Sequence, residues 1–184
     1  MGSQEQSIKS VLGILDEAGI PYMVVGSYAA SFHGLSRATH DLDLVVKLSA
    51  DSVNTLLERL GDAFYWDTQA AERAVSQSDM FNAIDHDSGL KVDFWILSND
   101  DFANTQFERR RQVSFDGVQC WVASAEDTIL SKLRWYKMSA SERQLSDAQA
   151  IFAVAGDSLD TRYIGQWAQR LGLLDVLRTA EQGP

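Results

Sequence analysis

The spacing of apolar residues predicts an alternation of helices and strands over the first two thirds of the chain. Four apolar residues recur every three or four positions before Gly19, which predicts one helix over 4–19: Ile8, Val11, Leu12 and Leu15. Short apolar runs then indicate strands over 22–25, 41–48, 81–86, 90–97, 112–115 and 118–123. Helical periodicity returns at 28–34, 52–61 and 100–110.

Residues that favour helix caps and tight turns punctuate this pattern. Ser27 is expected to cap the second helix, and Ser49 or Asp51 the third. Asp-Ser-Gly at 87–89 and Asp-Gly at 116–117 each join two strand-like runs, which is typical of a hairpin. Two segments are ambiguous, the second being weakly helical: 62–67 and 71–79.

The character of the chain changes after Ser124, because only helical patterns follow. Three segments carry them: 125–138, 141–156 and 161–180. We therefore predict an α/β fold with a mixed sheet over residues 1–123, followed by a helical, bundle-like extension over residues 124–184. No linker-like segment separates the two parts, so the extension is expected to pack on the core.

Composition limits the cellular location and the classes of binding partner that we expect for the protein. The chain of 184 residues is 45% hydrophobic, and its net charge of -10 disfavours charge-driven binding, so no DNA partner is expected. Arg109, Arg110 and Arg111 form a basic run that is either a solvated face or a patch contacting phosphates. The single cysteine, Cys120, is expected to be buried. Without a bilayer-length apolar run or a signal-peptide pattern, we expect a cytoplasmic protein with no membrane partner.

Two carboxylates interrupt the apolar run over 41–48. Because side chains alternate along a strand, Asp41 and Asp43 point to one face while Leu42 and Leu44 point to the other. The apolar second face indicates a central strand rather than a solvent-facing edge. Neighbouring carboxylates repel each other, and Mg²⁺, which prefers oxygen ligands, would relieve that repulsion. Two such ions can stabilise both the attacking and the leaving oxygen of a phosphoryl transfer.

Two further features favour phosphate chemistry. Gly26 and Ser27 lie between a strand and a helix, where glycine permits close approach of a ligand and a helix N-terminus attracts phosphate. Asp93 interrupts the strand over 90–97, where an unpaired carboxylate is costly, so it either pairs with a cation or joins the first two aspartates. In the second case it could hold a metal ion and accept the proton of an attacking hydroxyl.

The order of these features resembles the nucleotidyltransferase superfamily, whose polymerase-beta-like core is shared by DNA polymerase beta, CCA-adding enzymes and kanamycin nucleotidyltransferase. The run RATHDLD, from Arg37 to Asp43, is similar to the AbiEii-type branch, which includes toxins of type IV toxin–antitoxin systems. SAEDTILSKLRWY and RQLSDAQAI look like later motifs of that branch, a helical lysine and then an aspartate, matched here by Lys132 and Asp147. The resemblance covers most of the chain from residue 22 to residue 174.

The resemblance implies a role for each matching residue. Nucleotide binding would fall to Gly26, Ser27, Arg37 and Lys132, metal binding to Asp41, Asp43 and Asp93, and orientation of the lysine to Asp147. Two Mg²⁺ ions would be bound, and Mn²⁺ could replace them. From the residues alone, Lys132 could instead extend along the surface to solvent, Asp147 could be a helix-face charge, and Arg37 could pair with the aspartates.

The leading hypothesis is a Mg²⁺-dependent nucleotidyltransferase that moves a nucleoside monophosphate from an NTP to a hydroxyl of RNA, protein or a small molecule. By resemblance, a toxin with an antitoxin or operon partner is one setting. The alternatives are a non-catalytic module that binds a nucleotide or a partner, and an antibiotic adenylyltransferase, whose cationic substrate would need acids such as Glu126, Asp127 and Glu142. The five tryptophans are expected in the core, and His40 as a partly buried residue rather than a ligand.

Overall fold

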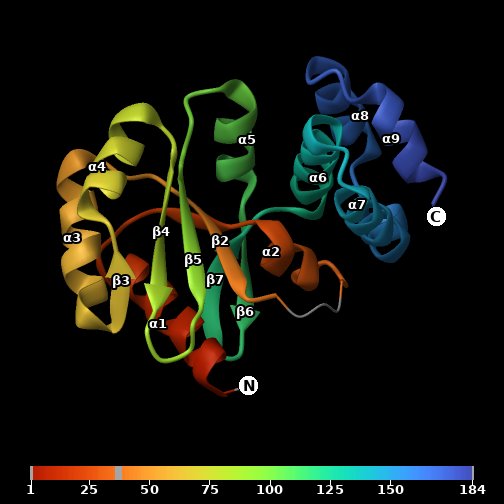
Figure 1. The fold of residues 1–184 in the computed structure, drawn as a ribbon. Helices are drawn as coiled ribbons and strands as arrows, with labels where there is room; N and C mark the ends of the chain where they lie inside the picture. The colour runs from red at the N-terminus through yellow and green to blue at the C-terminus, as the bar shows by residue number, and fades with distance from the viewer. Residues whose placement is uncertain (1, 36–38, 184) are drawn as a thin grey trace.

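A computed structural model of the chain describes residues 2–35 and 39–183. In these residues one mixed sheet of seven strands lies at the centre of the fold (Figure 1). The strands are β1 (Tyr22–Val24), β2 (Asp41–Val46), β3 (Phe64–Trp66), β4 (Met80–Asp85), β5 (Lys91–Ile96), β6 (Arg111–Phe115) and β7 (Val118–Val122). Their spatial order is β3-β4-β5-β2-β1-β7-β6, so β2 is central, as its apolar second face predicted.

Strand pairing decides which residues of different strands meet. β2 pairs with β1 in antiparallel and with β5 in parallel orientation, and the second pairing sets Asp43 opposite Asp93. The two predicted hairpins are confirmed as β4–β5 and β6–β7. The second turn holds Asp116 and Gly117 at φ values of 44° and 83°, which the Asp-Gly sequence tolerates well.

Helices flank the sheet and make up the C-terminal region. They are α1 (Gly2–Glu17), α2 (Gly26–Phe32), α3 (Ala50–Leu60), α4 (Thr68–Gln77), α5 (Asp101–Arg109), α6 (Ala125–Ser139), α7 (Glu142–Ala155), α8 (Thr161–Arg170) and α9 (Leu174–Glu181). Figure 1 shows α6 to α9 gathered beyond α2 and α5, with α3 and α4 at the opposite end. The mixed α/β class is confirmed, whereas a domain division between residues 123 and 124 stays a prediction. None of the described helices has the length and apolar character needed to cross a membrane.

Two apolar clusters stabilise the fold. The first joins the sheet to α1 and α3 and contains Leu44 and Phe94, and the second lies among α6 to α9 and contains Leu130. All three side chains are fully buried, and burial of each contributes about 1.5–3 kcal/mol. Because Leu44 and Phe94 point into the core, Asp43 and Asp93 on the same strands must project from the other face of the sheet.

The first residue and the N-cap residue of α2 differ from the predictions, whereas the N-cap residue of α3 agrees with one of the two candidates. α2 begins at Gly26 with Val25 as its N-cap residue, so Ser27 lies in the first turn and does not cap the helix. The earlier start arises because Gly26, at φ +64°, turns the chain directly from β1 into the helix. Of the two candidates for α3, Ser49 is the N-cap residue. The first ambiguous segment contains β3, the second overlaps most of α4, and Cys120 is buried as expected.

Candidate active site

The turn between β1 and α2 lies against a carboxylate of β2. A Cβ added at Gly26 would lie 2.8 Å from Asp43 Cγ and closer still to Oδ2. Any side chain at Gly26 would therefore collide with Asp43, and it would also be strained at a φ of +64°. Val25 N donates to Asp43 O at 2.9 Å, which fixes the turn to β2. Ser27 follows and lines the same cleft as Gly26 and Asp43.

Asp43 and Asp93 face each other across β2 and β5. They are register partners in the parallel pair, so both carboxylates project from one face of the sheet. Burial raises the pKa of Asp43, and the like charge of Asp93 raises it further. Asp93 is 7% exposed, and its Oδ1 is buried without a hydrogen-bond partner among the described residues. The two carboxylates therefore destabilise each other, and a cation bound to both would relieve the repulsion.

Lys91 already neutralises part of this charge. Its Nζ donates to Asp93 Oδ2 at 2.8 Å, and this hydrogen bond raises the pKa of Lys91. The two side chains meet because residues two apart on a strand share a face. Of the two alternatives for Asp93, pairing with a cation is thus observed, while its second oxygen stays open to a further partner.

The other predicted ligands at this face lie in different surroundings. Asp41 is exposed at the start of β2, opposite Lys91 in the register. Within residues 2–35 and 39–183, no three His, Cys, Asp or Glu side chains are placed to hold a metal ion. A metal-binding role for Asp41 stays a prediction, and Arg37 lies outside the described residues. His40 is exposed rather than partly buried, and its Nδ1 lies 3.1 Å from Gln4 Nε2.

α6 and α7 contribute a buried ion pair. Lys132 Nζ donates to Asp147 Oδ2 at 2.6 Å, and each residue is only 5% exposed. Lys132 is thus not an extended surface lysine, and Asp147 is not a solvated helix-face charge. Lys132 also lines the cleft that contains Asp43, and its positive charge slightly offsets the raised pKa of that carboxyl. The pair therefore joins the helical region to the carboxylates of the sheet.

A cleft of about 550 Å³ lies between the sheet and α6, a size that suits a nucleotide-sized ligand. Of the predicted site residues, four line it: Gly26, Ser27, Asp43 and Lys132. These four are called the polar part of the cleft. α6 contributes side chains that lie mostly on one face of the helix: Thr128, Ser131, Lys132, Arg134, Trp135 and Met138. Asp93 adjoins the cleft through Asp43, and Asp147 through Lys132.

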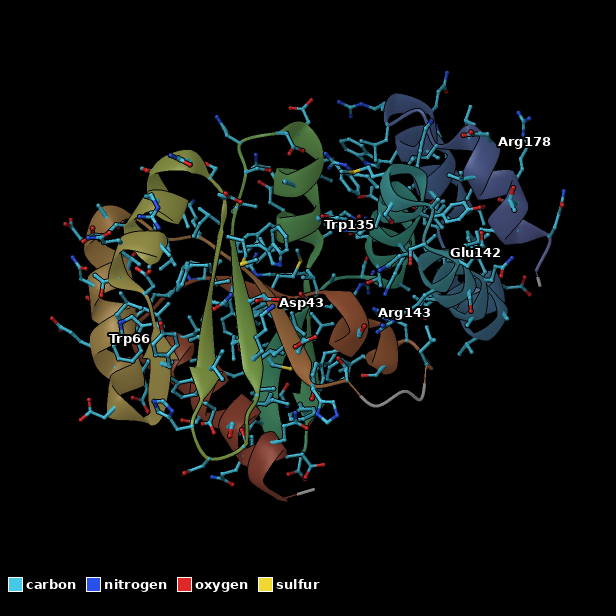
Figure 2. The ribbon with its side chains drawn as sticks, in the orientation of Figure 1. Asp43, Trp66, Trp135, Glu142, Arg143 and Arg178 are labelled. Atoms are coloured by element: carbon cyan, nitrogen blue, oxygen red, sulfur yellow. The ribbon has the colours of Figure 1, made fainter. Side chains whose placement is uncertain are left out.

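Trp95, Trp135 and Met138 form an aromatic part of the cleft that was not predicted, since all tryptophans were expected in the core. The rings of Trp95 and Trp135 meet edge to face, with centroids 6.2 Å apart. Trp135 is 48% exposed and Met138 70%, and Figure 2 shows Asp43 on β2 and Trp135 on the side of α6 toward the sheet. The sequence spacing could have predicted this position. Trp95 follows Asp93 by two residues and so shares its face of the strand, and Trp135 follows Lys132 by three and so shares its face of the helix.

The basic run at 109–111 does not form a continuous patch. Arg109 Nε lies 3.3 Å from Asp127 Oδ2, its Nη2 lies 3.5 Å from Glu126 Oε2, and its guanidinium stacks on Tyr163. Arg110 lies over two aromatic rings, and the third arginine is exposed. Arg109 therefore ties α5 to α6 and α8 instead of facing solvent or phosphate. The same contacts occupy Glu126 and Asp127, which are consequently not free to bind a cationic substrate.

Solved structures of similar fold include a nucleotidyltransferase-like protein and an antibiotic adenylyltransferase. A solution structure of the antibiotic-resistance factor ANT(2'')-Ia has 12% identity and a TM-score of 0.63, over 96% of this chain and 97% of that one. An antigenic nucleotidyltransferase-like protein from Paracoccidioides brasiliensis has 17% identity and a TM-score of 0.58, over 97% and 92%. The lincomycin-bound lincosamide antibiotic adenylyltransferase LnuA has 11% identity and a TM-score of 0.57, over 84% and 98%. At such identities the likeness concerns the fold.

Sequence comparison assigns the family. No curated protein matches the chain significantly. A family described as nucleotidyltransferase of unknown function (DUF6036) matches residues 4–164, a range that contains the cleft, the carboxylates and the ion pair. The match supports the predicted superfamily and leaves the AbiEii-type branch a prediction. With most of its length matched, the chain belongs to this DUF6036 family of nucleotidyltransferases.

Proposed function

We propose that the protein transfers a nucleoside monophosphate from an NTP to a hydroxyl group in a Mg²⁺-dependent reaction. The observation that carries the proposal is the close approach of Gly26 to Asp43, which stands opposite Asp93 and shares a cleft with Lys132. This arrangement combines a backbone that can approach a ligand, two carboxylates and an ammonium group. A metal-bound triphosphate needs all three of these features.

Asp43 and Asp93 fit a divalent cation. Asp93 offers a buried oxygen without a partner, and the raised pKa of Asp43 reflects burial and repulsion that a bound cation would offset. Asp41 would add a ligand from the same face of β2. Mg²⁺ suits these oxygen ligands and retains phosphate partners, and Mn²⁺ could replace it. When bound, the metal would stabilise the charge on the attacking and leaving oxygens.

The proposed reaction joins the acceptor oxygen to the α-phosphorus and releases pyrophosphate, as the bond from that phosphorus to the bridging oxygen breaks. Asp93 would take the proton of the acceptor hydroxyl. Lys132 would balance the charge of the triphosphate and the departing pyrophosphate, and Asp147 would hold its ammonium group in place. Gly26 and Ser27 would lie along the phosphates, and Arg37 would add a further cation beside them.

Incorporation of label from NTPs tests this function. The protein would be incubated with each α-labelled or γ-labelled NTP, Mg²⁺, and total RNA, lysate protein or candidate small molecules. We expect the α-label and not the γ-label to reach an acceptor, and Asp43→Asn to abolish the transfer. Asp62→Asn, at an exposed position outside the cleft, is the matched control. Transfer at the wild-type rate by folded Asp43→Asn would overturn the proposal.

The acceptor determines the biological setting, and a toxin acting on RNA is the finer proposal. It is supported by the resemblance of RATHDLD and by the pair that Lys132 and Asp147 form. Induced expression in bacteria should then arrest growth, with relief by Asp43→Asn and by a neighbouring antitoxin gene. Unaffected growth, together with transfer to a small molecule in the labelling assay, would instead favour an acceptor like those of the antibiotic adenylyltransferases.

A further inference from the structure

The aromatic part leaves large apolar surfaces open beside the polar part of the cleft. Trp135 is 48% exposed although it lines a concave site, and Met138, one turn later on α6, is 70% exposed. Surfaces of this kind next to polar groups typically contact ligands. The phosphates and metal of the proposed reaction give these apolar side chains nothing to contact.

Trp95 connects the aromatic part to the reacting groups. Its side chain hydrogen-bonds to Asp43, and it shares a face of β5 with Asp93. On the other wall, Trp135 shares a face of α6 with Lys132. A ligand that stacks on Trp135 is therefore adjacent to both the carboxylates and the ammonium group, as one substrate of a transfer reaction must be.

The charges of the cleft disfavour a polycationic ligand. Among the described residues that line it, the carboxylates are Asp43 and Asp100. Asp100 is already engaged, because one oxygen accepts from Ala103 N at 2.9 Å and the other from Ser98 Oγ at 2.6 Å. Arg134 adds a positive charge that acts on Asp100. With Asp43 assigned to the metal of the proposed reaction, no further carboxylate among the described lining residues is left to neutralise a polyamine.

We propose that Trp95 and Trp135 form a stacking subsite for a planar aromatic ring, and that the cleft rejects polycationic acceptors. This inference rests on the proposed nucleotidyl transfer and specifies its substrate. The ring is either the base of the NTP or an aromatic group of the acceptor, such as the terminal base of an RNA. Both offer a flat face, and an aromatic side chain stacks on any base with little sequence preference.

Binding measurements on Trp135→Ala test the proposal, because this exposed side chain can be removed without opening the core. Calorimetric titrations with Mn²⁺ present would use a non-hydrolysable ATP analogue, inorganic tripolyphosphate, a short RNA oligonucleotide and, as the polycationic ligand, tobramycin. Tyr65→Ala, which removes an exposed aromatic residue outside the cleft, is the matched control. We expect Trp135→Ala to weaken binding of one ring-bearing ligand about tenfold, with tripolyphosphate binding unchanged.

The ligands whose binding is weakened by Trp135→Ala identify whether the nucleotide or the acceptor carries the stacked ring. Weaker binding of the ATP analogue assigns it to the nucleotide, and weaker binding of the oligonucleotide alone assigns it to the acceptor. Equal affinities in wild type and Trp135→Ala for every ligand would overturn the stacking subsite, and micromolar binding of tobramycin would overturn the rejection of polycations. If the wild type bound neither the ATP analogue nor tripolyphosphate, the proposed function would be contradicted. This would hold even if binding of the oligonucleotide were weakened by Trp135→Ala.

Discussion

The polar and aromatic parts of the cleft differ in what holds their side chains in place. Asp43 is fixed by strand register and by the contact with Gly26, and Lys132 by a buried ion pair. Trp135 and Met138 line the cleft from α6, remain 48% and 70% exposed, and depend far less on the surrounding fold. The polar part is therefore coupled to stability, whereas the aromatic part can change with little effect on folding.

This contrast separates the groups that are proposed to react from the side chains that are proposed to recognise the substrate. Neither charge of the Lys132–Asp147 pair can be removed alone without leaving the other uncompensated, so this pair is constrained. Exposed side chains beside them can be substituted with small effects on the free energy of unfolding. One fold of this kind could thus keep its reaction while its acceptor changes.

The largest expected effect comes from breaking the buried pair. Asp147→Ala leaves the Lys132 ammonium buried without its partner, and should lower the free energy of unfolding by about 3–5 kcal/mol in urea titrations. The double variant Lys132→Met/Asp147→Leu should recover most of that stability while lacking transfer activity. A single variant as stable as wild type would show that the pair does not anchor α6 to α7.

Substitution at Gly26 should have the next largest effect. Gly26→Ala combines left-handed strain with a collision against Asp43, for a loss of about 2–3 kcal/mol and of nucleotide binding. Gly61→Ala is the matched control, because Gly61 has a φ of +56° but open space around it, and should cost about 1–2 kcal/mol. Similar losses at both positions would mean that the close approach to Asp43 does not matter.

Neutralising Asp43 should stabilise the protein. Its pKa is raised by burial and by Asp93, so ionisation in the folded state costs stability as pH rises from the ordinary value of 3.8 through the raised value. Asp43→Asn should raise Tm at neutral pH, and the gain should vanish below the ordinary pKa. Thermal scans between pH 3 and pH 8 would check this, and a gain independent of pH would contradict it.

The smallest effect on folding is expected in the aromatic part. Trp135→Ala should change the free energy of unfolding by no more than about 0.5 kcal/mol, because nearly half of the side chain is exposed. Denaturant titrations would measure the change. A loss above about 2 kcal/mol would place Trp135 in the structural core and remove the contrast between the two parts of the cleft.

The polar part could be predicted because its signals are local in sequence. Alternation along one strand placed Asp41 and Asp43 on the same face, and the apolar residues on the other face indicated a central strand. Gly26 was marked by its position between a strand and a helix. The cap at Ser27 was wrong because the positive φ of Gly26 starts the helix two residues earlier than the pattern suggests.

The remaining features depend on contacts between distant segments. Trp95 and Trp135 meet only because the fold places α6 across the cleft from β5, a geometry that periodicity alone does not specify. Arg109 was expected either on a solvated face or in a patch contacting phosphates, but it pairs with Asp127 and Glu126, which lie on another helix. Hydrophobic patterns predict which face of an element is buried, and they do not predict which element covers it.

Calorimetric titration of Mn²⁺, with and without a non-hydrolysable NTP analogue, tests most directly whether the polar part is a metal–nucleotide site. The wild type should bind metal and nucleotide cooperatively, each tightening the other, because Asp43 and Asp93 share the cation with the triphosphate. Asp43→Asn should lose this coupling while remaining folded, and Asp62→Asn should keep it. Nucleotide binding that is independent of metal, or equal coupling in Asp43→Asn and wild type, would contradict the proposed site.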